Sequence, residues 1–238
     1  MTDSPSPIVF DAQRAAAYDQ QFAQLAPMRD ALHLVARLVL SDLPSDARVL
    51  CVGVGTGLEL LDLALAFPRW RFTAVEPAAP MLAICRQKVA ANGLNERCAL
   101  HEGYLESLPA QPPFDAATVL LVSHFLVEYA ARRAFFAEIA ERLRPGGYLV
   151  TADLANGASP ETFERLFEVW ARALRHAGMT PEQVAGMRDS YGRDVALSAP
   201  GEVERIITDA GFDPPVQCFQ ALLMHGWYTT RARDDRST

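Results

Sequence analysis

Lysine is almost absent from this chain of 238 residues, because Lys88 is the only one and every other basic residue that is not a histidine is an arginine. The formal net charge is −7. Such an acidic balance repels nucleic-acid phosphates unless a local basic patch overrides it. A nucleic-acid partner is therefore not indicated.

Long apolar runs are also missing, and we expect no secretory leader. The longest apolar stretch, 116–127, is too short to span a bilayer and is interrupted by Ser123 and His124. The chain starts Met-Thr-Asp-Ser-Pro-Ser-Pro, which has neither a basic start nor an apolar core. We expect no membrane partner and a cytoplasmic location.

Cysteine pairs are absent as well. The four cysteines, Cys51, Cys85, Cys98 and Cys218, form no Cys-x-x-Cys motif. This spacing argues against a zinc ribbon or a redox dithiol and suits buried, reduced thiols. We expect no metal site.

The region 45–154 alternates short apolar runs with helical patterns, which is typical of βαβ units around a parallel sheet. Strands are predicted at 48–52, 71–76, 98–102, 114–122 and 148–153. A helix over 78–91 should end at Asn92-Gly93, and one over 132–143 at a turn through Arg144-Pro145-Gly146-Gly147. These signals predict an α/β fold, a Rossmann-like doubly wound sheet.

Helical segments flank this core, and we expect one domain over 1–238. An N-terminal helical cap covers 8–40 and is broken at Pro27. A C-terminal helical insertion covers 155–200, with helix starts at Ser159-Pro160 and at the capping box Thr180-Pro181-Glu182-Gln183. A final helix from about residue 201 and two β-like runs, 216–223 and 227–231, close the chain around Met224-His225-Gly226.

The strongest chemical signal is the glycine loop, where the strand 48–52 runs directly into Gly53, Gly55 and Gly57. Glycine lets the backbone turn sharply and approach a ligand, and the amides at the following helix start favour a negative group. In a dinucleotide-binding fingerprint the third glycine falls one residue later, at Leu58 in this chain. The spacing favours a methyltransferase over a dehydrogenase.

A second signal lies at the end of the second predicted strand, in Val75-Glu76-Pro77. A carboxylate there stands beside the glycine loop, where it can accept both hydroxyls of a ribose. The alternative is a surface glutamate at a strand end. The glycine loop upstream favours the ligand interpretation.

Residues 47–154 resemble the class I S-adenosylmethionine-dependent methyltransferases. Five elements match in order: the glycine loop, Glu76 with Met81, Gly103, Phe114-Asp115, and Leu143-Arg144-Pro145-Gly146-Gly147. Each element alone is weak, but five in register are specific. The resemblance implies a seven-stranded sheet and S-adenosyl-L-methionine as cofactor.

The resemblance also implies site residues. The methionine part of the cofactor would lie against the three glycines and the ribose on Glu76. The adenine would lie among Pro77, Met81, Tyr104 and Leu105, next to Gly103. Leu120 and Leu121 would face the reactive end. Many members carry an acid at the positions of Cys51 and Tyr104, so this chain departs from the pattern twice.

Tyr18 resembles a Tyr-Asp element that closes over the cofactor in many small-molecule methyltransferases; the alternative is an aromatic residue that anchors a helix.

Methyl transfer needs a general base only if the acceptor must lose a proton. His124 is the first choice, with Glu128 and His225 as other candidates, although a histidine in an apolar run is more often a packing residue. In the insertion, Phe163, Phe167, Trp170 and Leu174 recur at helical spacing. They form either a packing stripe or an apolar wall for the acceptor.

The leading hypothesis is therefore a methyltransferase acting on a small-molecule acceptor. The 120–128 region has some likeness to enzymes that make a carboxylated form of the cofactor, but no specific residue favours that interpretation. A nicotinamide-dependent oxidoreductase is the second hypothesis; a short-chain dehydrogenase would need tyrosine where Ile84 precedes Lys88. The third is a methyltransferase-like protein that binds cofactor without turnover. The oligomeric state is not predicted.

Overall fold

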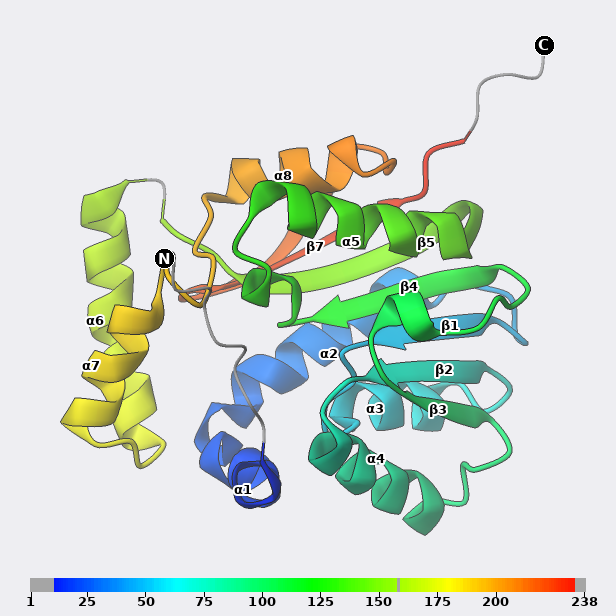
Figure 1. Ribbon diagram of the computed structural model, residues 1–238, viewed down its shortest axis with the longest axis horizontal. Coiled ribbons are helices and arrows are strands. Elements are labelled where there is room, and N and C mark those ends of the chain that lie inside the picture. Colours follow the sequence, from blue (N-terminus) through cyan, green and yellow to red (C-terminus); the bar gives the residue numbers. More distant parts are fainter. Residues whose placement is uncertain (1–10, 158, 234–238) are drawn as a thin grey trace, which may run out of the picture.

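The computed structural model describes residues 11–157 and 159–233, which contain a seven-stranded sheet with helices on both faces (Figure 1). The strand order is β3-β2-β1-β4-β5-β7-β6. Strands β1 to β5 pair in parallel, and β7 joins them antiparallel to β5 with β6 outside it. The strands are β1 Arg48–Val52, β2 Arg71–Glu76, β3 Cys98–Glu102, β4 Phe114–Leu120, β5 Leu143–Leu154, β6 Val216–Ala221 and β7 Met224–Thr230. The predicted seven-stranded α/β fold is confirmed.

The strand predictions are correct for β1, β2 and β3 and too long for β4, which ends at Leu120. Leu121 has φ 61, a left-handed conformation that a strand cannot continue through. Strand β5 starts earlier than predicted, because Leu143 already pairs with Phe114 across a register shift. The turn expected at 144–147 is therefore an irregular start of β5, with Gly146 at φ 73.

Helices α2, α3 and α4 cover one face of the sheet. Their buried side chains, such as Leu40, Leu60 and Leu82, pack on β1 and β2 around Val49 and Phe72. The bounds are α2 Ala26–Leu40, α3 Leu58–Ala66 and α4 Ala79–Ala91. The predicted end of α4 is confirmed, since Asn92 is its C-cap and Gly93 has φ 68.

Helices α5 and α8 cover the other face. Phe136 and Ile206 pack there on Leu149 and Trp227. The bounds are α5 Tyr129–Arg142 and α8 Pro200–Asp209, with short helices η2 Leu105–Ser107 and η3 Ser123–Phe125 in the loops before and after β4.

A third apolar cluster, which we call the cap cluster, joins segments from outside the core. Phe167, Trp170 and Leu174 of α6 pack there with Leu25 and with Leu223 of the β6–β7 turn. Figure 1 shows α6 and α7 beyond the carboxyl end of β4, with α1 nearby. The bounds are α1 Ala12–Gln21, η1 Ala23–Leu25, α6 Pro160–His176 and α7 Pro181–Ser190. Residues 8–10 of the expected N-terminal cap lie outside the described part.

The helix starts of the cap follow the predicted signals. The hydroxyl of Ser159 accepts the N–H of Thr162 at the start of α6. Thr180 and Gln183 form both bonds of a capping box at α7. The break in the N-terminal helices falls at 22–25, and Pro27 occupies the first turn of α2.

The closing hairpin exists, but its turn was predicted in the wrong place. Leu222, with φ 55, and Leu223 make the turn, whereas Met224, His225 and Gly226 belong to β7. These three residues pair with β5, so the neighbouring strand extends β7 through them. No helix among the described residues is long and apolar enough to cross a membrane.

Candidate active site

The glycine loop between β1 and α3 is shaped by two close approaches. The N–H of Gly53 donates to the carbonyl of Val75 over 2.8 Å. Gly53 has φ 67, and a Cβ there would lie 2.5 Å from Cγ2 of Val122. Gly57 has φ 85, and a Cβ there would lie 2.6 Å from Sγ of Cys85. Only glycine fits both positions, so the loop brings bare backbone to the positive end of α3.

Glu76 lies against this loop, as predicted. Its Oε2 accepts the N–H of Gly55 and its Oε1 accepts the N–H of Ala78, each over 2.9 Å. Burial raises the pKa of Glu76, and the two amide donors partly offset that effect. Each carboxylate oxygen keeps a second lone pair, so the group can still accept hydroxyl hydrogen bonds.

The residues predicted to hold an adenine are only partly together. The N–H of Gly103 donates to the carbonyl of Glu76 over 3.1 Å, and Pro77 follows directly in the chain. The methyl of Met81 lies 3.5 Å from where a Cβ at position 55 would be. Tyr104 is 63% exposed beside this group. Leu105 is buried in the core near α5, so only its backbone can border the site.

A buried acid lies behind the glycine loop, close to Cys51. Glu59 accepts a hydrogen bond from Oγ1 of Thr118, and the Cys51 thiol donates to it as well. Burial raises the pKa of Glu59 to about 7, although both hydrogen bonds act to lower it. No role for Glu59 was predicted from the sequence. The available signal was an acid inside the apolar run of α3.

Helix α1 contacts both the loop and α4. The ring of Tyr18 packs on that of Phe22, with centroids 5.1 Å apart. The next residue, Asp19, accepts the hydroxyl hydrogen bond of Thr56 over 2.7 Å and pairs with Lys88. Tyr18 and Asp19 form the Tyr-Asp element noted in the sequence, but the contacts of Asp19 with Thr56 and Lys88 were not predicted.

The side chains at and just after the end of β4 pack in different apolar clusters. Leu120 packs with the cluster under α2 and α3, whereas Leu121 packs against the cap cluster. The N–H of Leu121 donates to Ala152 over 2.6 Å, which holds the left-handed residue in place. The next residue, Val122, is the one that closes on Gly53. Val122 therefore belongs to the loop's surroundings, although the sequence analysis did not select it.

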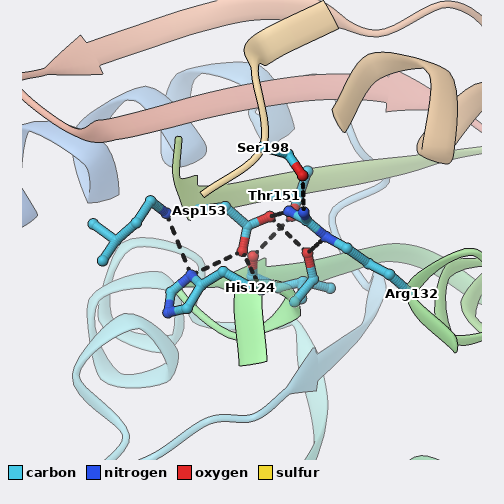
Figure 2. Close-up of polar contacts among 8 residues, drawn as sticks. His124, Arg132, Thr151, Asp153 and Ser198 are labelled. Atoms are coloured by element: carbon cyan, nitrogen blue, oxygen red, sulfur yellow. Dashed lines mark hydrogen bonds and ion pairs between the residues drawn. The ribbon is translucent and has the colours of Figure 1, made fainter. Parts of the chain in front are cut away.

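His124 follows in η3 and is only 3% exposed. Its Nδ1 lies 3.1 Å from Oδ1 of Asp153, and its backbone N–H donates to the same oxygen over 2.9 Å (Figure 2). Because a carboxylate only accepts, this contact places the ring proton on Nδ1 and leaves the lone pair on Nε2. The N–H of Leu154 also approaches Nδ1, at 3.3 Å, and is the longer contact.

Asp153 is the centre of the buried network in Figure 2. Its Oδ2 accepts from Ser123 over 2.6 Å and from Arg132 over 2.8 Å. Burial alone would raise the pKa of Asp153, but the Arg132 charge and the donors from His124 and Ser123 outweigh it and lower the pKa. Ser198 lies within 3.5 Å of Arg132. The network thus joins η3, β5, α5 and the segment before α8.

Neither of the two other candidate bases has a side-chain hydrogen bond to this network among the described residues, although His225 pairs with Asp153 in the register of β5 and β7. His225 is buried on β7, where burial lowers its pKa, and its Nδ1 contacts Gln217 at 3.2 Å. Glu128 is an exposed residue at the start of α5. Neither side chain has a hydrogen bond to His124 among the described residues. His124 is the candidate whose ring is held by the carboxylate of Asp153.

The cap cluster reaches this end of the sheet, because Leu121 and Leu154 pack against it. Phe167, Trp170 and Leu174 are buried, so much of the predicted stripe is packing. The indole of Trp170 donates to the hydroxyl of Tyr191 over 3.0 Å. The cap is therefore mainly apolar where it meets β4 and β5.

The sequence of this chain is similar to sequences of known methyltransferases. A family model described as a methyltransferase domain matches residues 49–147. A demethylmenaquinone methyltransferase from Roseiflexus castenholzii is 26% identical over 84% of this chain and 87% of its own length. These matches do not favour a nicotinamide-dependent oxidoreductase.

Solved structures share the fold. A crystal structure described as a putative O-methyltransferase from Nostoc punctiforme has a TM-score of 0.65 at 17% identity, over 90% of this chain and 60% of that one. The N-methyltransferase NodS from Bradyrhizobium japonicum, in complex with S-adenosyl-L-homocysteine, has a TM-score of 0.57 at 16% identity, over 86% of this chain and 87% of that one. The chain thus spans less than two thirds of the first of these structures.

Proposed function

Because the chain belongs to the class I S-adenosylmethionine-dependent methyltransferases, we propose that it methylates a small, partly apolar acceptor held between the core and the cap. The cofactor is S-adenosylmethionine. The acceptor, its location and the roles of the individual residues are parts of the proposal. A cytoplasmic location stays a prediction of the sequence.

The residues around the loop fit this cofactor. Bare backbone at Gly53 and Gly57 leaves room for close approach, and Glu76 keeps acceptor lone pairs beside the loop. The glycines would hold the methionine part, Glu76 the ribose, and Pro77 with Met81 the adenine. When bound, the cofactor supplies a methyl group on a positively charged sulfur, which is an excellent leaving group.

One observation supports the acceptor site: Asp153 holds His124 at the end of the sheet where Leu121 and Leu154 pack against the cap cluster. An apolar cap at this point would exclude water from the transfer and shape a pocket. The demethylmenaquinone relative carries a small-molecule acceptor in its name, which agrees with this class.

Methyl transfer forms a bond from the acceptor atom to the methyl carbon and breaks the carbon–sulfur bond, whose electron pair stays on sulfur. Alignment of the two reactants accounts for much of the rate, roughly 7–11 kcal/mol in well-oriented systems. For an acceptor that carries a proton, Nε2 of His124 takes it. Asp153 holds the ring in the tautomer that leaves this nitrogen free.

Cofactor binding comes first among the tests. Calorimetric titration should show binding of S-adenosylmethionine and S-adenosylhomocysteine, and ligand at one hundred times its Kd should stabilise the fold by about 2.7 kcal/mol. Binding of NADH without binding of either methionine compound would contradict the cofactor.

One assay tests both the class of acceptor and the role of His124 as a base. It measures release of S-adenosylhomocysteine with a panel of phenols, hydroquinones, carboxylic acids, peptides and oligonucleotides. With an acceptor that loses a proton, His124→Gln should slow turnover by about 10²- to 10⁴-fold. His176→Gln, at an exposed position at the end of α6, is the matched control. Calorimetry with S-adenosylhomocysteine checks that both variants keep the cofactor site. Turnover on peptides alone would refute the small-molecule acceptor. Full turnover of His124→Gln would refute His124 as the base.

A further inference from the structure

The connection between β3 and β4 leaves part of the sheet without a helix. Residues 103–113 join these strands and contain only the short helix η2, whereas α3, α4 and α5 make the other crossovers between the parallel strands. Phe72 and Cys98 pack in the cluster under α3 and α4, so the alternation of side chains turns Thr73 and Ala99 to the opposite face. Ala99 is exposed there. The amino ends of β2 and β3 therefore present an open surface on this face.

A groove of about 170 Å³ lies on this surface, and we call it the arginine groove. Three arginines line it: Arg48 at the start of β1, Arg71 at the start of β2 and Arg97 just before β3. Because these are the amino ends of parallel strands, the groove lies at the opposite end of the sheet from the glycine loop. Pockets for drug-sized ligands measure roughly 300–1,000 Å³. The arginine groove therefore suits a smaller ligand.

Carbonyl oxygens hold two of these guanidinium groups in place. Arg97 donates to three main-chain carbonyls at the end of α3 and in the turn that follows, over 2.9 to 3.2 Å. Arg48 donates to the carbonyls of Pro112 and Pro113 and to Oε1 of Gln111. A guanidinium carries five N–H donors, so each group has donors beyond these three bonds. Side chains that are already held lose little entropy when a ligand binds.

The positive charges of the groove are not neutralised by ion pairs. Within residues 11–157 and 159–233, none of the three arginines pairs with a carboxylate. Arg71 is exposed and makes one long bond, of 3.4 Å, to the main-chain carbonyl of Glu96. The exposed Glu96 also lines the groove, whereas the carboxylate of Asp115 near Arg48 is paired with Arg144. Three positive charges thus lie together in a chain whose net charge is −7.

We propose that the arginine groove binds the phosphate group of a small molecule, at a site separate from those of the cofactor and the acceptor. The planar fork of a guanidinium matches the oxygens of a phosphate through paired N–H bonds. Three such groups around one groove suit a phosphate, which has several charged oxygens, better than a single carboxylate. This inference does not depend on the proposed function.

The test is a titration of the isotope-labelled full chain with pyrophosphate and with glycerol 3-phosphate, followed by amide NMR at constant ionic strength. Saturating S-adenosylhomocysteine is present, because the amides at the start of α3 also attract negative groups. The amide signals of Arg71, Thr73 and Ala99 should shift with a Kd of about 1 mM or below. Binding of both compounds identifies a phosphate ester as ligand, and binding of pyrophosphate alone identifies inorganic phosphates. Shifts confined to the glycine loop, or a Kd above about 10 mM for both compounds, would overturn the inference.

Charge reversal in the groove gives a second measurement. Arg71→Glu replaces an attractive charge by a repulsive one at an exposed position and should weaken binding of pyrophosphate by about tenfold or more. Arg86→Glu makes the same change at an exposed position of α4, on the other face of the sheet, and should leave the Kd unchanged. Equal weakening in both variants would reveal general charge attraction and overturn the site. Citrate that binds as tightly as pyrophosphate would overturn the phosphate class.

Discussion

Replacing Glu76 by glutamine removes a negative charge from the proposed cofactor site. In the structure its two oxygens accept the N–H groups of Gly55 and Ala78. Glutamine keeps one oxygen and turns an NH₂ group toward the other amide, so one partly buried N–H loses its acceptor, at a cost of about 1–3 kcal/mol. The free protein should therefore melt lower, by roughly 2–4 °C for each kcal/mol. The loop depends on Glu76 even before the cofactor binds.

Binding should suffer as well. Hydrogen bonds to a charged group contribute about 1.5–3 kcal/mol, which corresponds to a roughly tenfold to hundredfold weaker Kd for S-adenosylhomocysteine in Glu76→Gln. Calorimetric titration and a thermal scan measure the two effects. Glu96→Gln makes the same change at an exposed position before β3, at the opposite end of the sheet, and should behave as wild type. Equal affinities in the two variants would show that the ribose does not lie on Glu76.

Three further substitutions follow from the buried groups. Because burial raises the pKa of Glu59 from 4.5 to about 7, the folded chain holds a proton in this window that the unfolded chain releases, and stability falls as pH rises through it. This loss in the free energy of unfolding is about 3 kcal/mol. Urea unfolding at about pH 5 and pH 8 should show it in the wild type but not in Glu59→Gln. The same pH dependence in both proteins would contradict this. Arg132→Met removes the positive charge that pairs with the buried Asp153 carboxylate and should cost about 3–5 kcal/mol in urea unfolding, whereas the exposed Arg133→Met should cost little. Similar losses in both variants would refute the pairing. Gly53→Ala should abolish cofactor binding in a calorimetric titration, since its φ of 67 and the nearby Val122 both exclude a side chain, and normal affinity would disprove the loop geometry.

Local signals predicted most of the secondary structure. Strands β1 to β3 match their predicted bounds, and Thr180 with Gln183 forms the expected capping box. Such signals act over a few residues, through backbone preference and side-chain caps. They failed where a neighbouring strand decided the outcome: Met224 to Gly226 read as a turn but pair with β5, and the turn falls on two leucines that carry no turn signal.

The candidate site also contains residues that a local motif predicts and contacts that only the tertiary structure decides. The sequence alone determined the glycine loop, Glu76 and the family resemblance, because each depends on a short motif whose residue types follow from backbone geometry or charge. Only the tertiary structure decided that Asp153 holds His124 and Arg132, residues 29 and 21 positions away, and that Asp19 meets Lys88 across 69 positions. Such contacts depend on which strands become neighbours and how the helices pack on them. No local pattern records the identity of a residue's distant partner.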